Sequence, residues 1–358
     1  MTQTSEGLSQ AMEKATAARG DWEVCGVAWM RVAEIARELG NRPVLEEALL
    51  RGVDATRRAD WPERVEACAR LALALVKTSD SRILLLVHLA ASLLEAGDVE
   101  RARREAESAL QLAGGGPMSP YAADTLAGIR LVSGQVDGLG ELLEQWPSQE
   151  GTGGAAQLYR RGQLLRLGGD LDEARQCFLR TIGELENREG AEAALGAAWQ
   201  EMGEVELLVD APDQAANMFH QSVGWWQKSG RKSGFYRAEA GRARSMLATQ
   251  QTYLPQGLDA GIHYARERTM PLLEAEIRLA RGICRWEASQ EGALEDLNTA
   301  VRIGEERGSP LVAGRARLER FLRGEGSGQR DLEVALRELQ GDSWWRQRAW
   351  STLRASRS

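Results

Sequence analysis

The sequence predicts an all-α protein built as an array of helical hairpins, and three observations support this fold class. Ala, Leu, Glu and Arg recur at helical spacing, while β-branched residues are too scattered to build strands. Glycines are concentrated at breaks between helical stretches, where a residue free to adopt positive φ ends one helix and a turn reverses the chain. The stretches that follow these breaks resemble one another, which is typical of repeat proteins.

The clearest copies of the repeated unit begin with a Gly-Asp turn, followed by an acidic residue and then by small or apolar residues at helical spacing. They are GDWEVCGVAWMRVA from Gly20, GDVERARREAESAL from Gly97 and GDLDEARQCFLRTI from Gly169. Weaker copies are ADWPERVEACARLA from Ala59, GQVDGLGELL from Gly134, DAPDQAANMFHQSV from Asp210 and QEGALEDLNTAV from Gln290. The copies recur at roughly 34 to 45 residues, the range of helical repeat arrays.

The segment Gly168–Ile182 places three acidic residues just after a glycine pair, which is compatible with a cation site or with the start of a helix. A cation site needs several oxygen ligands converging on one point. Asp170 and Glu173 instead have the spacing that stabilises a helix N-terminus, and Ala174 and Phe178 follow at core positions. The same pattern recurs in other copies, so we favour the helix start.

Each copy follows a helix that carries small residues, such as Ala90 and Gly203, where two helix backbones must approach closely. With the Gly-Asp turn and the aromatic residue on the second helix, this pattern resembles the tetratricopeptide repeat (TPR) of bacterial proteins, over most of residues 1–340. The resemblance implies a right-handed α-solenoid of about eight or nine helix-turn-helix repeats. The repeats near 241–267 and 310–340 are degenerate and their register stays open. We expect one continuous array with any hinge near 147–154, where Pro, Ser and Gly gather.

The resemblance also implies a site, because the first helices of successive TPR units line the concave groove. By that carry-over the groove changes from apolar through mixed to basic and aromatic along the chain. The predicted partner-binding residues are Leu84, Val87, Leu94, Tyr121, Leu131, Tyr159, Gln163, Arg166, Gln200, Arg278, Arg285 and Trp286. For each residue the alternative is packing between neighbouring repeats.

Residues 341–358 predict a C-terminal helix that Asp342 or Ser343 caps. One interpretation is a helix that covers the last exposed core of the array. The other is a basic docking helix for an acidic partner or membrane surface, with the candidate residues Trp344, Trp345, Arg348 and Trp350. A second basic and aromatic stretch, from Trp225 to Arg237, is interpreted as a solvated turn or as an anion-binding rim.

Catalytic, metal and nucleic-acid functions are not predicted. The chain has no P-loop, GxSxG, HExxH or GxGxxG motif, so we expect neither an enzyme nor a cofactor. The four cysteines and three histidines are far apart, and we expect buried free thiols rather than metal ligands. A net charge of -7 argues against nucleic acid as a partner. The longest apolar run, Ile83–Leu94, is too short to span a bilayer, and the first residues lack a signal-peptide core, so we expect a bacterial cytoplasmic protein.

These features predict a non-catalytic scaffold or adaptor that binds a peptide or a helix of one or more partner proteins in its concave groove. A membrane would be reached only through a membrane-associated partner. The chaperone-type carboxylate clamp is not predicted, because the asparagines do not fall on first helices. The alternative is a ligand-sensing regulatory module that acts on a separate kinase, ATPase or transcription regulator. The partner, its pathway and the oligomeric state stay open.

Overall fold

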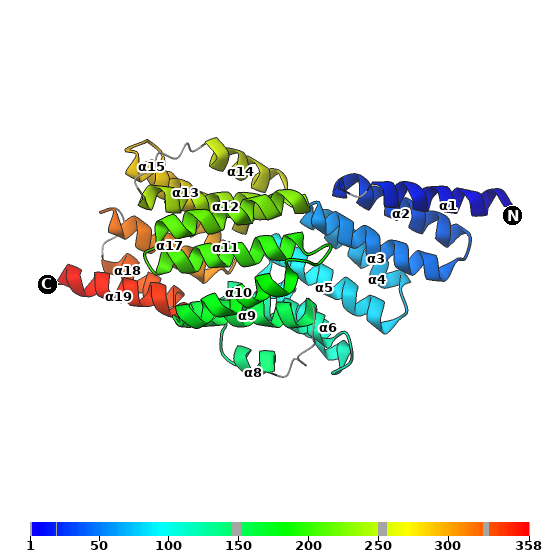
Figure 1. The fold of residues 1–358 in the computed structure, drawn as a ribbon, viewed down its shortest axis with the longest axis horizontal. Coiled ribbons are helices and arrows are strands. Elements are labelled where there is room, and N and C mark those ends of the chain that lie inside the picture. The colour runs from blue at the N-terminus through cyan, green and yellow to red at the C-terminus, as the bar shows by residue number, and fades with distance from the viewer. Residues whose placement is uncertain (1, 19, 145–151, 250–255, 325–328, 358) are drawn as a thin grey trace. The chain divides into compact units, whose positions relative to one another are not determined.

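A computed structural model describes residues 2–18, 20–144, 152–249, 256–324 and 329–357. Within these residues the chain forms nineteen α-helices and no β-strand, so the all-α prediction is confirmed (Figure 1). The helices are α1 Thr2–Ala17, α2 Trp22–Glu38, α3 Arg42–Arg58, α4 Pro62–Leu75, α5 Ser79–Glu95, α6 Val99–Ala113, α7 Ser119–Val132, α8 Leu139–Glu144, α9 Thr152–Gly168, α10 Leu171–Leu185, α11 Glu192–Leu208, α12 Pro212–Ser229, α13 Lys232–Ala248, α14 Gln256–Glu267, α15 Pro271–Glu287, α16 Ala293–Glu306, α17 Pro310–Leu322, α18 Gln329–Glu338 and α19 Ser343–Arg357.

The chain divides into two compact units. Unit 1 contains Met1–Leu126 and the short segment Ser229–Lys232, and unit 2 contains Ala127–Lys228 and Ser233–Ser358. Helices that follow one another pack together, as α5 and α6 do in unit 1 and α15 and α16 in unit 2. First helices of successive hairpins also contact each other, α3 with α5 in unit 1 and α9 with α11 in unit 2. This arrangement confirms the predicted helix-turn-helix repeat.

In several of the described hairpins the turn contains a residue with positive φ. Gly97 and Gly169 adopt φ of +78° and +93° in two of the clear copies. In the weaker copies Asp60 and Asp210 take the same position, with φ of +57° and +60°. Aspartate tolerates the left-handed region better than most side chains, because its short polar group can bond locally. The turn is therefore retained where the Gly-Asp motif is lost.

Glycines in unit 2 make room for aromatic rings of α12. A Cβ at Gly203 of α11 would lie 2.8 Å from the ring of Phe219, and one at Gly241 of α13 would collide with the opposite part of that ring. Trp226 is enclosed in the same way by a glycine from α11 and one from α13. Phe219 is fully buried. Gly203 was predicted to mark a close approach of two helix backbones, whereas the atoms nearest to its Cβ position belong to the aromatic ring of Phe219.

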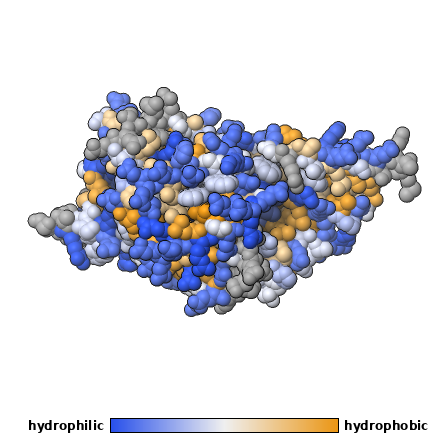
Figure 2. All heavy atoms as spheres, viewed as in Figure 1, coloured by the Kyte–Doolittle hydropathy of each residue, from blue (hydrophilic) through white to orange (hydrophobic). Residues whose placement is uncertain are grey.

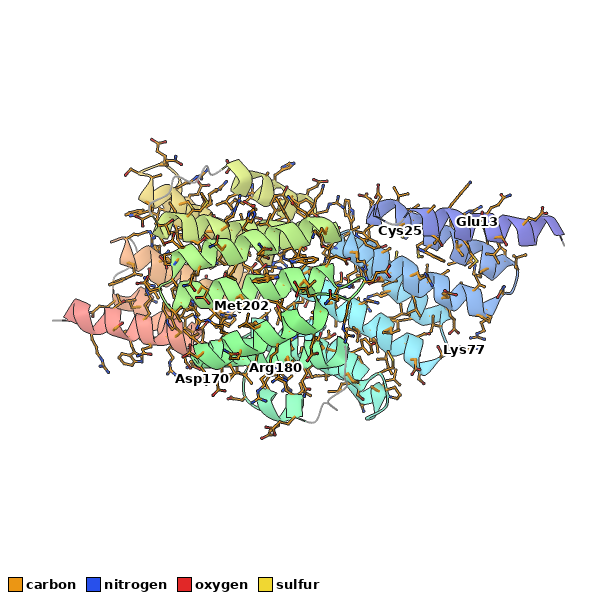
Figure 3. The ribbon with its side chains drawn as sticks, in the orientation of Figure 1. Glu13, Cys25, Lys77, Asp170, Arg180 and Met202 are labelled. Atoms are coloured by element: carbon orange, nitrogen blue, oxygen red, sulfur yellow. The ribbon has the colours of Figure 1, made fainter. Side chains whose placement is uncertain are left out.

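The start of α10 agrees with the predicted helix start in all but one detail. Asp170 occupies the N-cap position of α10, in the turn after α9 (Figure 3). Ala174 and Phe178 are fully buried. The Asp170 side chain nevertheless accepts no hydrogen bond from a helix N–H, whereas Asp98 accepts one from the backbone of Arg101 at 3.1 Å. The expected side-chain cap is therefore wrong for Asp170 and present in the equivalent turn before α6.

The last helix of unit 2 packs against α17, α18 and α9. Ala349 and Leu353 of α19 are buried, and Asp342 caps the helix by accepting from the backbone N–H of Trp345 at 3.2 Å. Nearby, the turns at Gly134 and Gly341 touch so closely that a Cβ at Gly341 would collide with the carbonyl oxygen of Gly134. The first and last parts of unit 2 are thus in contact.

Several expectations fall on parts of the chain that are not described. Most of the expected hinge at 147–154 lies there, as do residues 250–255 and 325–328 within the degenerate repeats. None of the helices in the described ranges combines the length and the apolar character needed to cross a membrane. Hydrophilic side chains cover most of the face drawn in Figure 2, with apolar residues gathered in patches between them.

Candidate partner-binding surface

The predicted partner-binding residues, from Leu84 to Trp286, lie on the first helices α5, α7, α9, α11 and α15. The surface that these residues would form is called here the first-helix surface. In unit 2 it begins with Tyr159, Gln163 and Arg166 on α9, which the structure brings together. The Gln163 amide donates to the Tyr159 hydroxyl at 3.1 Å and to Glu201 of α11 at 2.7 Å. Arg166 Nε donates to the other oxygen of Glu201 at 2.8 Å. The ring of Tyr159 also lies edge-on to the buried ring of Phe178, with centroids 5.9 Å apart.

Glu204, one turn further along α11, joins this network to two more helices, α13 and α17. It pairs with Arg244 of α13, and the charges of Arg315 on α17 and Arg166 on α9 also act on it. Burial disfavours its charged form, but these cations outweigh burial and hold the Glu204 pKa below its ordinary value. Arg315 in turn donates to Asp342, which precedes α19, at 2.7 Å. Alternating charges therefore connect the first helices of unit 2 to one another.

The predicted basic part of the site is not free to bind a partner. Arg278 is only 5% exposed and donates to Asp296 of α16 at 2.6 Å. Arg285 donates to the same carboxylate at 3.0 Å, and Arg281 does so at 2.5 Å. Asp296 is itself 1% exposed. The predicted register of α15 is wrong here, because this stripe of arginines faces a second helix and neutralises a buried acid.

The apolar part of the predicted site lies at α5 and α7. Tyr121 of α7 is 55% exposed, while Leu84 and Leu94 of α5 are half-buried. Val87 is partly buried against a small cluster that includes Ala122 of α7. Leu131, at the far end of α7 and within unit 2, is 5% exposed and belongs to the interior instead. Gln200 and Trp286, in unit 2, are half-buried.

Unit 1 also contains a polar centre that sequence reasoning missed. Asp60, in the turn after α3, and Glu95, at the end of α5, both accept from Arg231, at 3.1 Å and 2.8 Å from Nη2. The stretch around Arg231 was expected to bind an external anion or to be solvated. Its arginine instead binds two carboxylates of unit 1. The weak repeat at Ala59 was the available signal, since it places an acid at the turn position.

His88 lies beside this centre on α5. Burial, followed by the nearby charge of Arg57, lowers the pKa of His88 to about 4, although Asp54 acts in the opposite direction. Burial also lowers the pKa of Arg57, with Arg231 as the next cause. The Asp54 carboxylate balances part of this positive charge, because it accepts from Arg57 at 3.3 Å and from Arg58 Nε at 2.7 Å. The centre thus places three guanidinium groups and three carboxylates near the imidazole of His88.

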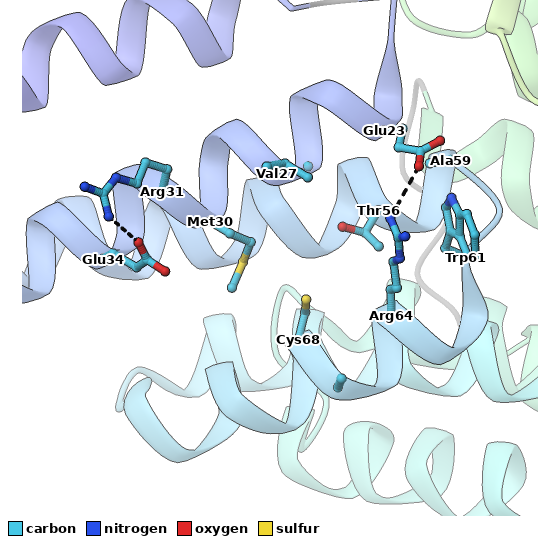
Figure 4. A pocket seen from close by; sticks show the side chains of 12 residues that line it. Glu23, Val27, Met30, Arg31, Glu34, Thr56, Ala59, Trp61, Arg64 and Cys68 are labelled. Atoms are coloured by element: carbon cyan, nitrogen blue, oxygen red, sulfur yellow. Dashed lines mark hydrogen bonds and ion pairs between the residues drawn. The ribbon is translucent and has the colours of Figure 1, made fainter.

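A pocket of about 380 Å³ opens in unit 1 between the second helices α2 and α4 (Figure 4). Val27, which is 65% exposed, and Met30 line it from α2, and Cys68 lines it from α4. Arg64 stacks 4.0 Å from the ring centroid of Trp61 and reaches Glu23 at 3.3 Å. This pocket was not predicted. The sequence signal for it was the presence on α2 of apolar residues outside the buried set, Val24 and Val27, which are 53% and 65% exposed.

The cysteines follow the prediction with one exception. Cys25, Cys177 and Cys284 are buried, and burial raises the pKa of the Cys284 thiol to about 12. Cys68 is only partly buried and lines the pocket, so the expectation of a buried thiol is wrong there. Among the described residues no group of His, Cys, Asp and Glu side chains is arranged to hold a metal ion.

The tryptophans of α19 divide into two groups. Trp344 and Trp345 pack edge to face, with centroids 4.9 Å apart, and Arg348 lies over both rings. Arg315 of α17 also lies 5.4 Å from the ring of Trp345. Trp350, by contrast, is 44% exposed. The first pair takes part in packing within unit 2, and only Trp350 presents a large exposed ring.

Solved structures with the same arrangement of hairpins include a Rap protein complexed with Competence and Sporulation Factor. The two chains share 14% identity with a TM-score of 0.53, over 77% of this chain and 80% of the Rap chain. The fold is a TPR-like α-solenoid. Human IFIT1, as a dimer with PPP-AAAA, matches this TPR-like chain at 14% identity and a TM-score of 0.50, over 100% of this chain and 87% of IFIT1. A monomeric IFIT1 mutant with Gppp-AAAA has the same identity and TM-score, with coverage of 93% and 77%.

The predicted resemblance is confirmed at the level of fold, which is what likeness at this identity shows. The sequence matches no protein-family model and no curated protein.

Proposed function

We propose that this TPR-like protein is a non-catalytic scaffold that holds a peptide or helix of a partner protein on the first-helix surface of unit 1. The proposal rests on one observation, the uncovered apolar side chains of α5 and α7. Tyr121 of α7 is 55% exposed, and Leu84 and Leu94 of α5 are half-buried. Exposed aromatic rings surrounded by apolar contacts are the usual anchors of protein interfaces.

Unit 2 is a weaker candidate for the same role, because its own side chains engage one another. A partner at Arg166 would have to replace the bond to Glu201, and one at Tyr159 would disturb packing against Phe178. Loss of one member of a buried ion pair leaves an uncompensated charge, which is costly. The likeness to the Rap protein, whose structure contains Competence and Sporulation Factor, is compatible with binding of another molecule by such a fold.

The test compares two exposed apolar residues of unit 1. Tyr121→Ala removes the proposed anchor, whereas Leu112→Ala removes a 42% exposed side chain from α6, a second helix. A partner is first identified by purification with the wild-type protein. We expect Tyr121→Ala to lower the affinity for this partner by about tenfold or more, which is ~1.4 kcal/mol of binding free energy. Leu112→Ala should bind normally. Equal recovery of the partner by both variants would show that this surface is not the site.

A ligand-sensing function is the second candidate, and the pocket between α2 and α4 favours it. Its volume of about 380 Å³ is within the range of small-molecule sites. A metabolite that binds there should raise the melting temperature of the wild-type protein. Val27→Arg, which fills the mouth of the pocket, should abolish that increase. An unchanged thermal response in this variant contradicts the idea.

A further inference from the structure

The pocket between α2 and α4 is flanked at both ends by charges that are paired within its own lining. At one end Arg64 reaches Glu23 at 3.3 Å, and at the other end Arg31 reaches Glu34 at 2.6 Å (Figure 4). Each charged side chain of the lining therefore has a partner of opposite sign that also lines the pocket. A charged ligand would gain little here in return for its lost hydration, so the charges favour an uncharged occupant.

The inner side of the pocket offers few hydrogen bonds to a ligand. Thr56 of α3 is buried, and its hydroxyl donates to the carbonyl oxygen of Gly52 at 2.7 Å. A Cβ at Gly26 of α2 would lie 2.7 Å from the same hydroxyl oxygen, so α2 and α3 are in close contact behind the pocket. A ligand with several polar groups would leave them without partners, which is unfavourable. The inner side therefore fits an apolar molecule.

Two sulfur-bearing side chains, Met30 of α2 and Cys68 of α4, point toward one another from opposite walls of the pocket (Figure 4). A Cβ at Gly52 would lie 2.9 Å from Met30 Sδ, so the thioether rests against α3. The exposed Val27 and Ala67 line the same two walls. Sulfur is polarisable and makes favourable contacts with aromatic rings. The lining therefore favours an aromatic ring over an aliphatic group of the same size.

We propose that this pocket binds an uncharged aromatic molecule, held between α2 and α4 with its ring against Met30 and Cys68. The volume of about 380 Å³ is within the range of small-molecule sites, and apolar contact supplies the affinity. The proposal rests on the ligand-sensing function proposed above and names the chemical class of its ligand. A side chain of a partner protein is the other occupant that the experiment distinguishes.

Cys68 is a reporter within the site, because Cys25, Cys177 and Cys284 are buried. The uncharged aromatic probe N-phenylnaphthylamine should slow alkylation of Cys68 by N-ethylmaleimide in the full-length chain. At a free probe concentration about ten times the dissociation constant, the rate should fall about tenfold, because only the unoccupied pocket reacts. Probe fluorescence measures the dissociation constant, and peptide mapping by mass spectrometry measures the alkylation rate. An unchanged rate would overturn the proposal.

Two matched comparisons test the position of the probe and its charge. Ala67→Phe fills the pocket from the wall of α4 and should abolish probe binding. Ala74→Phe is the control, because Ala74 is another exposed alanine of α4 and does not line the pocket. Anilinonaphthalenesulfonate, which adds a negative charge to the same ring system, should bind at least about tenfold more weakly. Full binding by Ala67→Phe, or equal affinity for the two probes, would contradict the proposal. If circular dichroism shows Ala67→Phe to be unfolded, Val27→Arg replaces it.

The preference for an aromatic ring is tested with phenol and cyclohexanol, which are both uncharged and similar in size. Phenol should displace the probe at an at least about threefold lower concentration, the effect of two sulfur–aromatic contacts at the lower end of their range. Met30→Leu keeps the bulk of the side chain but removes one sulfur, so it should reduce this ratio. Equal competition by the two alcohols would show that the ligand class is wrong.

Failure of this proposal is distinguishable from failure of the ligand-sensing function. If no aromatic molecule binds, but a metabolite of another class stabilises wild type and not Val27→Arg, the sensing function stands and the ligand class is wrong. If a co-purified partner protein protects Cys68 from alkylation and small aromatic molecules do not, the pocket belongs to a protein interface, and the proposal is overturned. Probe binding without a thermal response to any metabolite counts against the sensing function alone.

Discussion

Among single residues, His88 should couple protonation most clearly to folding. Its pKa of about 4 in the folded chain results from burial and then from the charge of Arg57. An unfolded histidine titrates near pH 6.5, so between about pH 6.5 and 4 the unfolded chain binds more protons. Stability from this group is therefore complete above pH 6.5 and is lost as the pH falls towards 4.

We expect His88→Asn to lose less stability on acidification than wild type, by about 2 kcal/mol between pH 7 and 4.5. Urea unfolding at several pH values measures the difference. His263→Asn is the control, because His263 is an exposed histidine on α14. If both variants follow the wild-type pH profile, His88 is not the group responsible.

The sequence predicts the conformation of a residue when neighbouring residues in the chain determine that conformation, and not when a distant helix does. Positive φ at Gly97 and Gly169 follows from the turn alone, and the sequence motif is sufficient to predict it. The orientation of Arg278 depends on the position of Asp296 in another helix. A register shift of one residue on a helix moves a side chain by about 100°. The sequence therefore predicted that α15 is the first helix of a hairpin. It assigned to the groove the face of α15 that in the structure packs against α16.

At the scale of elements, α12 is held between α11 and α13 by rings that fit against glycines. The resemblance to TPR repeats predicted small residues at positions where the backbones of neighbouring helices approach each other. It did not predict that Phe219 meets a glycine from each side, at Gly203 and Gly241. A single sequence shows which residues are small but not which ring fills the space. The same limit explains why the pocket between α2 and α4 was missed.

Gly241→Ala tests this packing, because the added methyl group would collide with the ring of Phe219. Overpacking of a well-filled core costs about 1–3 kcal/mol. Gly183→Ala on α10 is the matched control, since a Cβ there meets nothing within 4 Å. That change should stabilise the helix by roughly 0.5–1 kcal/mol. Chemical denaturation should thus give opposite signs, and a stabilising effect of both substitutions would rule out the tight fit.

At the scale of the whole molecule, the sequence predicted one array, while contacts divide the chain into two compact units. Repeat similarity is a nearest-neighbour signal, because each hairpin mainly contacts the next one. It carries no information on contacts between distant hairpins, such as the packing of α19 on α9 or the meeting of Gly134 and Gly341. These contacts bring the first and last parts of unit 2 together, and the ion pairs of its first helices reinforce them.

Two units with separate cores should unfold as two transitions. Leu49 of α3 in unit 1 and Leu195 of α11 in unit 2 are each 1% exposed, so Leu→Ala at either position creates a comparable cavity and costs about 2–5 kcal/mol. For units of this size each kcal/mol lowers the melting temperature by roughly 2–8 °C. In calorimetry we expect Leu49→Ala to lower one transition and Leu195→Ala the other. A single transition that both variants lower by the same amount would mean that the units unfold together, because coupling between them then exceeds the stability of either unit alone.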